Sequence, residues 1–241
     1  MPESALSIGE SCAIMFEKNT KQKAGIPMAS IANVEICGLD SAIYRSGYSM
    51  LETAPTEEAF QAAVEQIRAD RLAGNYDNPH IRRAIKLSSI QEGGHDQFLT
   101  GAVVNFDLTI SNKAWVEAER YTFLNFISSM STMHRIARFK IGDFCNEYTS
   151  PAEIAEAERL QDAYNAIDPQ GDPEGKKRAY LELLYNLPSG FELMAGMTTN
   201  YRALKNIYAQ RRNHRLPDWH VVCDWIETLP LAAELITGKK D

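Results

Sequence analysis

The chain has 241 residues, of which 44% are hydrophobic and 24% are charged, and this composition excludes a disordered, fibrous or low-complexity chain. Its 32 acidic residues outnumber its 25 basic residues and give a formal net charge of -7. A negative field repels polyphosphate, so we expect no nucleic-acid polymer as a partner. Any phosphate group that binds must be held by a local basic cluster.

The length and the cysteine spacing predict one domain with reduced thiols. A domain commonly holds about 100–200 residues, and we expect a single domain over 1–241, with 1–30 as a possible N-terminal extension. The four cysteines form no C-x-x-C pair, which disfavours a disulfide framework or a zinc site. No stretch approaches the ~18 apolar residues of a membrane span, and the acidic start 1–4 differs from a secretory leader. We therefore expect a cytoplasmic protein that binds no membrane.

Boundary residues and apolar periodicity predict helices that alternate with short strands. Thr56 is a favourable N-cap, Pro79 fits a first helical position, and Ser150 with Glu153 fits a capping box. Alternating apolar and polar residues over 101–111 are typical of a half-buried strand. The predicted strands are 32–37, 101–111 and 191–197, and the predicted helices are 56–67, 79–92, 115–138, 150–166, 172–187, 198–212 and 217–228. We expect helices packed around a small sheet.

Polar groups interrupt an apolar face of the predicted helix 198–212. Asn200 and Arg211 lie within roughly 60° of each other, because eleven residues make almost three helical turns. They share this stripe with Leu204 and Ile207. A buried amide or guanidinium needs a hydrogen-bonding partner. The partner is either a ligand or the protein itself, in which case Asn200 is a helix cap and Arg211 pairs with a core carboxylate.

A second group of basic residues closes the predicted helix 115–138. Apolar residues spaced by three, four and seven positions end at His134, which places this histidine on a core-facing stripe. Arg135 and Arg138 supply the local positive charge that the acidic chain otherwise lacks. His134 is either a satisfied core residue or part of a binding site.

A turn with two glycines presents His95 and Asp96 just before the strand 101–111. Loops between rigid elements often carry binding residues, although a plain connection is the alternative. Cys145 has no base beside it in the sequence, which favours an inert buried thiol. The chain has no H-E-x-x-H motif and no phosphate-binding P-loop, so we expect neither metal catalysis nor ATP hydrolysis.

Taken together in chain order, these segments resemble the flavin-dependent thymidylate synthase family. Residues 133–138, Met-His-Arg-Ile-Ala-Arg, resemble the family motif R-H-R-x-x-S, and 146–149, Asn-Glu-Tyr-Thr, resemble the N-E-x-S that follows it. Residues 94–96, Gly-His-Asp, are similar to the family's G-H-E turn. Residues 200–204, Asn-Tyr-Arg-Ala-Leu, with Arg211, resemble its N-x-R-x-L helix and distal arginine. The resemblance extends over most of the chain.

The resemblance implies an α+β fold, with a small mixed or antiparallel sheet flanked by several long helices, and a homotetramer that holds FAD between subunits. It implies methylation of dUMP to dTMP, with methylenetetrahydrofolate as carbon donor, NADPH as electron donor and no protein nucleophile. It assigns His134, Arg135, Arg138, Asn200 and His95 to the cofactor, Glu147, Thr149, Arg202 and Arg211 to the nucleotide, and Arg211 and His95 to catalysis.

The chain departs from the family pattern at phosphate-binding positions. Met133 replaces the first arginine of the motif, Arg138 replaces its serine, and Pro151 stands where a phosphate-binding arginine is expected. Each lost charge-assisted contact costs about 1.5–3 kcal/mol. These departures leave open another pyrimidine reaction, such as hydroxymethylation, or a different nucleotide substrate. A non-catalytic nucleotide-binding relative and a helical interaction protein are the rival interpretations of the sequence.

Overall fold

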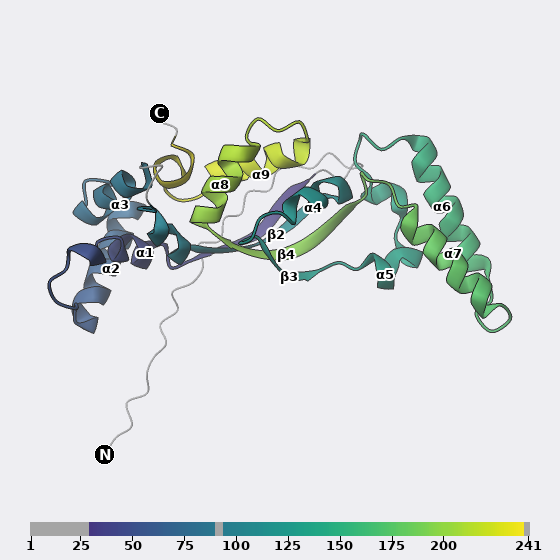
Figure 1. Cartoon of the computed structure of the whole chain (residues 1–241), viewed down its shortest axis with the longest axis horizontal. Coiled ribbons are helices and arrows are strands. Elements are labelled where there is room, and N and C mark those ends of the chain that lie inside the picture. Colours follow the sequence, from purple (N-terminus) through teal and green to yellow (C-terminus); the bar gives the residue numbers. More distant parts are fainter. Residues whose placement is uncertain (1–28, 90–93, 239–241) are drawn as a thin grey trace, which may run out of the picture.

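A four-stranded antiparallel sheet forms the middle of an elongated molecule (Figure 1). The structure is a computed structural model that describes residues 29–89 and 94–238. The strand order is β1-β2-β4-β3, with β1 at Ser30–Cys37, β2 at Val103–Ser111, β4 at Glu192–Asn200 and β3 at Asn125–Ser129. The predicted α+β class and small antiparallel sheet are confirmed.

One face of the sheet carries the main hydrophobic core. Val104, Phe106, Leu108 and Ile110 of β2 are all buried, as their alternation with polar residues predicts. Phe106 pairs with Met197 of β4, which is also buried. Helices α8 (Tyr201–Arg211) and α9 (Pro217–Glu227) contribute buried residues to the same core and lie along one side of the sheet in Figure 1.

Three helices cover one end of the molecule: α1 at Leu39–Arg45, α2 at Glu57–Leu72 and α3 at Pro79–Ser89. The Thr56 side chain accepts a hydrogen bond from the Ala59 backbone N–H at 3.2 Å, which confirms the predicted cap of α2. A buried ion pair joins α2 to α1, where Arg71 Nε lies 2.6 Å from an Asp40 carboxylate oxygen.

The opposite end consists of α6 (Pro151–Ala166) and α7 (Pro173–Tyr185), which pack side by side (Figure 1). The capping box at Ser150 and Glu153 is present, as predicted. Ile136, Ile141 and Leu183 belong to a second hydrophobic cluster, separate from the core on the sheet. The α6–α7 end therefore has an apolar interior of its own, whereas Ile43, Ile67 and Ile81 of the other end belong to the core on the sheet.

The predicted helix over 115–138 is wrong. The segment forms α4 at Asn112–Ala118, strand β3, and the short helix α5 at Thr132–Arg135. Phenylalanine and isoleucine in this segment suit a strand when a neighbouring strand is present, and β4 supplies the pairing partner. The apolar spacing does not mark a buried stripe, because Phe123 and Ile127 are 58% and 63% exposed. His134 is exposed as well, which contradicts its predicted core-facing position.

Helix α8 begins at Tyr201, later than the predicted start at Thr198 or Thr199, because those threonines continue strand β4. Short 3-10 turns occupy Tyr48–Met50, Gln97–Gly101, Ile136–Arg138 and Ile141–Phe144, and a π-helical turn occupies Ala233–Thr237. Cys145 and Cys223 are free and buried, but Cys37 is disulfide-bonded, which contradicts the expectation that every thiol is reduced.

No helix within 29–89 or 94–238 is both long and apolar enough to cross a membrane. Over the same ranges, no group of three or more histidine, cysteine, aspartate or glutamate side chains is arranged to hold a metal ion.

Candidate functional site

The predicted site residues lie in three places along the long axis. His95, Asn200 and Arg202 lie where α8 begins, close to the end formed by α1 to α3. Arg211 lies at the other end of α8, against α4 and α9. The segment 133–138 and Glu147 lie near α6 and α7, at the opposite end of the molecule in Figure 1. One chain therefore does not bring these residues around a single ligand.

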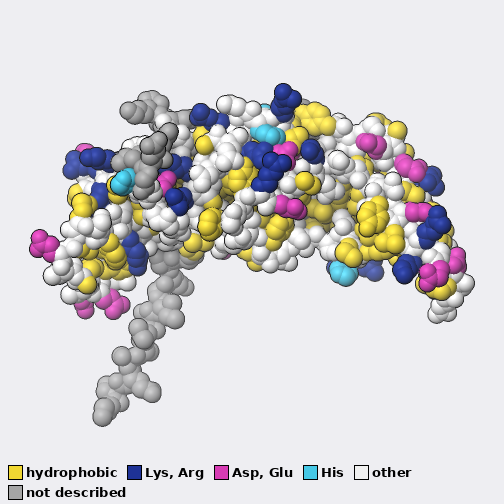
Figure 2. Space-filling model, in the orientation of Figure 1, with side chains coloured by type: hydrophobic (Ala, Val, Ile, Leu, Met, Phe, Trp, Pro, Cys, Tyr) yellow, Lys and Arg dark blue, Asp and Glu magenta, His cyan; other side chains and the backbone are white. Residues whose placement is uncertain are grey.

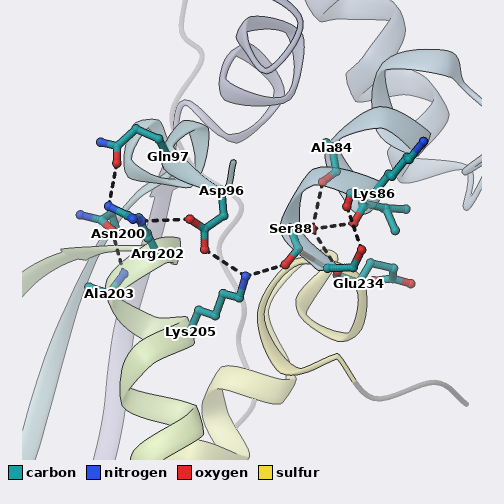
Figure 3. A network of polar contacts seen from close by, with 12 residues as sticks. Ala84, Lys86, Ser88, Asp96, Gln97, Asn200, Arg202, Ala203, Lys205 and Glu234 are labelled. Carbon is teal, nitrogen blue, oxygen red and sulfur yellow. Dashed lines mark hydrogen bonds and ion pairs between the residues drawn. The ribbon is translucent and has the colours of Figure 1, made fainter. Parts of the chain in front are cut away.

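A polar network fixes the turn that carries His95 (Figure 3). Asp96 accepts from Arg202 Nε at 3.1 Å through one carboxylate oxygen and from Lys205 Nζ at 3.0 Å through the other. Lys205 Nζ also donates to the backbone carbonyl of Ser88 at 2.5 Å, and Arg202 donates to the Gln97 side chain at 2.6 Å. Although burial opposes ionisation, Lys205 and Arg202 hold the pKa of Asp96 below its ordinary value. The network joins the turn to α8 and to the end of α3.

A pocket of about 580 Å³ opens beside His95. Arg45 and Phe98 line it, and the Arg45 guanidinium carbon lies 4.5 Å from the ring centroid of Phe60. Ser41, Ser46, Ser49 and Thr100 line it as well, and the hydroxyls of Ser41, Ser46 and Thr100 donate to backbone carbonyls. A guanidinium and several hydroxyls suit a phosphate or a sugar, and an aromatic ring suits a planar group. The pocket therefore has the chemistry to receive part of a nucleotide cofactor.

Asn200 caps α8 and keeps one polar group free. Its side-chain oxygen accepts from the Ala203 backbone N–H at 2.9 Å, which is the cap that the sequence left open as an alternative. Its amide nitrogen donates no hydrogen bond to any of the described residues. The cap and a contact to a ligand are therefore compatible.

Arg211 is 7% exposed and is surrounded by protein groups. Its Nη1 atom donates to Glu117 at 2.6 Å, and its Nε atom donates to the Tyr121 hydroxyl at 2.7 Å. The guanidinium carbon lies 4.6 Å from the ring centroid of Trp219. The alternative that Arg211 pairs with an internal carboxylate is therefore realised. Burial opposes ionisation of Glu117, but the Trp219 hydrogen bond and the charges of His214, Arg211 and Lys113 lower its pKa.

Unlike Arg211, the basic residues of the segment 133–138 lie at the surface. His134, Arg135 and Arg138 are exposed, and their side chains form no hydrogen bond or ion pair with the described part of the chain. Nearby, Glu147 is exposed, but Thr149 is buried and donates its hydroxyl to the Asn146 side chain at 3.2 Å. The exposed cations are available to a ligand or another chain, whereas Thr149 is used within its own turn.

Strand β3 lies at the edge of the sheet and carries exposed apolar side chains. Phe126 and Ile127 on this strand are 52% and 63% exposed. Figure 2 shows hydrophobic side chains at the surface along much of the molecule. An uncovered edge strand with apolar neighbours favours association with another chain.

The sequence analysis did not predict the buried acidic groups or the polar network around Asp96. Glu192 and Asp218 are 2% and 6% exposed, and Asp218 accepts from the Ser111 backbone N–H at 2.8 Å. One Glu192 oxygen has no hydrogen-bond partner in the described residues, and burial with the charge of Asp218 raises the pKa of Glu192 to about 7. Glu117 and Lys205 were also missed. The one available signal was that a buried arginine on helix 198–212 requires a carboxylate.

The free cysteines are unsuited to nucleophilic catalysis. Burial raises the pKa of the Cys145 thiol and of the Cys223 thiol to about 11 each. A nucleophilic cysteine reacts as its thiolate, so both groups are unreactive near neutral pH.

Solved structures identify the architecture. A thymidylate synthase X, or ThyX, from Helicobacter pylori, solved with FAD and dUMP, superposes with a TM-score of 0.58 at 15% sequence identity, over 87% of this chain and 97% of that chain. A second structure of the H. pylori flavin-dependent enzyme, also with FAD and dUMP, gives a TM-score of 0.55 at 13% identity, over 84% and 95% of the two chains. The chain has a ThyX-like fold. By sequence alone, no family model and no curated protein matches it.

Proposed function

We propose that the chain is a flavin-dependent enzyme that transfers a one-carbon unit to a deoxyuridine nucleotide. The specific reaction that we propose is methylation of dUMP to dTMP, with methylenetetrahydrofolate as carbon donor and NADPH as electron donor. The observation that carries this proposal is the similarity, over nearly the whole length of both chains, to an enzyme solved with FAD and dUMP. The pocket beside His95, which Arg45 and several serine and threonine residues line, supports it.

We propose that residues from several copies of the chain form the active site. His95 and Asn200 lie toward one end of the molecule, and the segment 133–138 lies toward the other. Both groups contact one cofactor only if different chains supply them. The exposed apolar residues beside β3 support such an assembly, and we propose a homotetramer.

We assign a role to each side chain according to its exposure and to whether it has a polar atom without an internal partner. His95 and the free amide nitrogen of Asn200 would contact the flavin. The exposed side chains of His134, Arg135 and Arg138 would bind the phosphates of FAD on a neighbouring chain. The nucleotide would contact Glu147 and Arg211. Arg202 would contact the nucleotide as well, because its Nη2 atom donates no hydrogen bond to the described residues and its side chain is 36% exposed. Thr149 is buried and bonded within its own turn, so we propose that it shapes the site and does not touch the nucleotide.

The protein's share of the chemistry is binding and orientation. Bound FAD would carry the electrons between NADPH and the one-carbon unit. With both free thiols protonated near neutral pH, no cysteine among the described residues is placed to act as a nucleophile. Arg211, as a fixed cation of low exposure, would polarise the pyrimidine ring.

A non-catalytic nucleotide-binding relative is the second candidate. The observation that favours it is the internal pairing of Arg211 with Glu117, together with the altered motif at Met133, Arg138 and Pro151. A protein that keeps the fold but loses these contacts would bind a nucleotide without turnover.

An assay of the purified full-length chain separates the two candidates. The chain is loaded with FAD and mixed with dUMP, methylenetetrahydrofolate and NADPH, and dTMP is measured. We expect dTMP to form only with all components present. Binding of FAD and dUMP without any product would support the non-catalytic relative. A product other than dTMP would indicate a different pyrimidine reaction, such as hydroxymethylation.

A further inference from the structure

Arg211 is held in one orientation by groups from two other parts of the chain. Glu117 on α4 and Tyr121, just after α4, accept from its Nη1 and Nε atoms at 2.6 and 2.7 Å. Trp219 of α9 lies against the face of the guanidinium, 4.6 Å from its carbon to the ring centroid. A planar guanidinium with two hydrogen bonds and one covered face has little freedom to rotate.

Glu117 is itself fixed, so it can determine where the guanidinium lies. The same Glu117 oxygen that accepts from Arg211 accepts from Trp219 Nε1 at 3.2 Å and lies 3.2 Å from His214 Nε2. Lys113 Nζ lies 3.9 Å from the other oxygen, and the Glu117 side chain is only 13% exposed. The carboxylate is thus bound from several directions, and its interaction with Arg211 is not an exposed surface ion pair.

One nitrogen of Arg211 is left over. The Nη2 atom donates no hydrogen bond to any residue in the described ranges, and it is not among the fully buried polar atoms without a partner. The internal contacts therefore use one side of the guanidinium fork and leave the other terminal nitrogen for a ligand.

We propose that Glu117 is a positioning residue for Arg211: it holds the guanidinium so that Nη2 is presented to the bound nucleotide. This inference rests on the proposed function, because it assumes that Arg211 contacts the nucleotide. Glu117 belongs to α4, and none of the segments that resemble family motifs includes a residue of this helix.

The test compares Glu117→Gln with Glu119→Gln in the FAD-loaded full-length protein. Glutamine keeps the size of the side chain and one acceptor but removes the charge, and Glu119 is an exposed glutamate two residues away. We expect Glu117→Gln to weaken dUMP binding about tenfold with FAD content unchanged, because a charge-assisted hydrogen bond becomes a neutral one. We expect no change in dUMP affinity for Glu119→Gln.

A double-mutant cycle with Arg211→Gln provides a readout that a merely structural role would not produce. If Glu117 acts through Arg211, the change Glu117→Gln has no further effect on dUMP affinity once Arg211 is glutamine. Equal, additive effects in both backgrounds, or unchanged affinity in the single Glu117→Gln variant, would overturn the inference. If the unaltered protein binds no dUMP, the proposed function fails instead, so the two failures are distinguishable.

Discussion

Glu117 and Glu192 are two largely buried glutamates beside the first turn of α9, and their pKa values shift in opposite directions. Burial opposes ionisation of Glu117, but the Trp219 hydrogen bond and the charges of His214 and Arg211 hold its pKa below the ordinary 4.5. Glu192 has burial and the negative charge of Asp218 around it, which raise its pKa to about 7, and one oxygen has no partner in the described residues. Burial opposes ionisation of both carboxylates, and the donors and positive charges around Glu117 outweigh it, whereas Glu192 has none in the described part of the chain to offset its burial.

The two glutamates contribute to stability with opposite pH dependence. The lowered pKa of Glu117 gives stability that is present above pH 4.5 and is lost as the pH falls through the folded-state pKa. The raised pKa of Glu192 gives stability that is present below pH 4.5 and is lost as the pH rises toward about 7. Substitutions that change the donors or the charge around these glutamates test this comparison, and the largest expected effect on unfolding comes first.

Arg211→Ala removes the donor that lies 2.6 Å from Glu117 and leaves Trp219 and His214 beside it. We expect a loss of about 3 kcal/mol in the free energy of unfolding, because a largely buried carboxylate loses a charged partner. We also expect dUMP affinity to fall about a hundredfold while FAD stays bound. Urea unfolding and calorimetric titration measure both effects, with Arg212→Ala on the exposed neighbour as the control. Intact dUMP binding in the Arg211→Ala variant would show that this arginine has only a structural role.

Glu192→Gln removes the group that is unfavourable when ionised. We expect the variant to lose the decline in stability between pH 4.5 and about 7, so that at pH 8 it gains about 2–3 kcal/mol relative to the unaltered protein. Urea unfolding from pH 5 to pH 8 measures this difference, and the exposed Glu119→Gln serves as the control. A constant difference at every pH would mean that Glu192 does not titrate in this range.

Trp219→Phe keeps an aromatic ring beside Arg211 but removes the indole N–H that donates to Glu117. We expect a loss of about 2 kcal/mol, since hydrogen bonds to charged groups contribute about 1.5–3 kcal/mol. The acid limb of the stability curve should also move to higher pH, because Glu117 would protonate more easily. An unchanged acid limb would show that Trp219 contributes packing alone.

Arg135→Ala extends the comparison to a cation that has no partner in the described residues. We expect no change in unfolding beyond about 0.5 kcal/mol, because the side chain is exposed. We expect FAD affinity to fall about tenfold if this guanidinium binds a phosphate of the cofactor. The neighbouring exposed cation in Lys140→Ala is the matched control. Equal FAD affinity in both variants would remove Arg135 from the proposed site.

Elements with local boundary residues could be predicted from the sequence. Thr56 and Ser150 cap α2 and α6 through hydrogen bonds to residues three positions away, so the information lies within the segment itself. The alternation in β2 likewise follows from burial of one face. The same local logic placed Asn200 and Arg211 on one face of a helix, where the structure shows a cap and a buried arginine.

Elements that depend on distant partners could not be predicted. Strand β3 exists because β4 pairs with it, and β4 lies far along the chain. The partner of Arg211 is Glu117, 94 positions earlier, and the carboxylate gives no local sign of that contact. The arrangement of His95 and the 133–138 segment at opposite ends of the molecule likewise follows from the fold, not from the motif.

Equilibrium binding of dUMP to the flavin-loaded full-length protein is the most direct measurement of the proposed function. The purified chain is incubated with FAD, freed of unbound cofactor by gel filtration and titrated with dUMP while the visible flavin spectrum is recorded. We predict that flavin stays with the protein and that its spectrum changes saturably with dUMP. A colourless protein that retains no FAD and binds no dUMP would contradict the proposal that the ThyX-like fold of this chain serves flavin-dependent nucleotide chemistry.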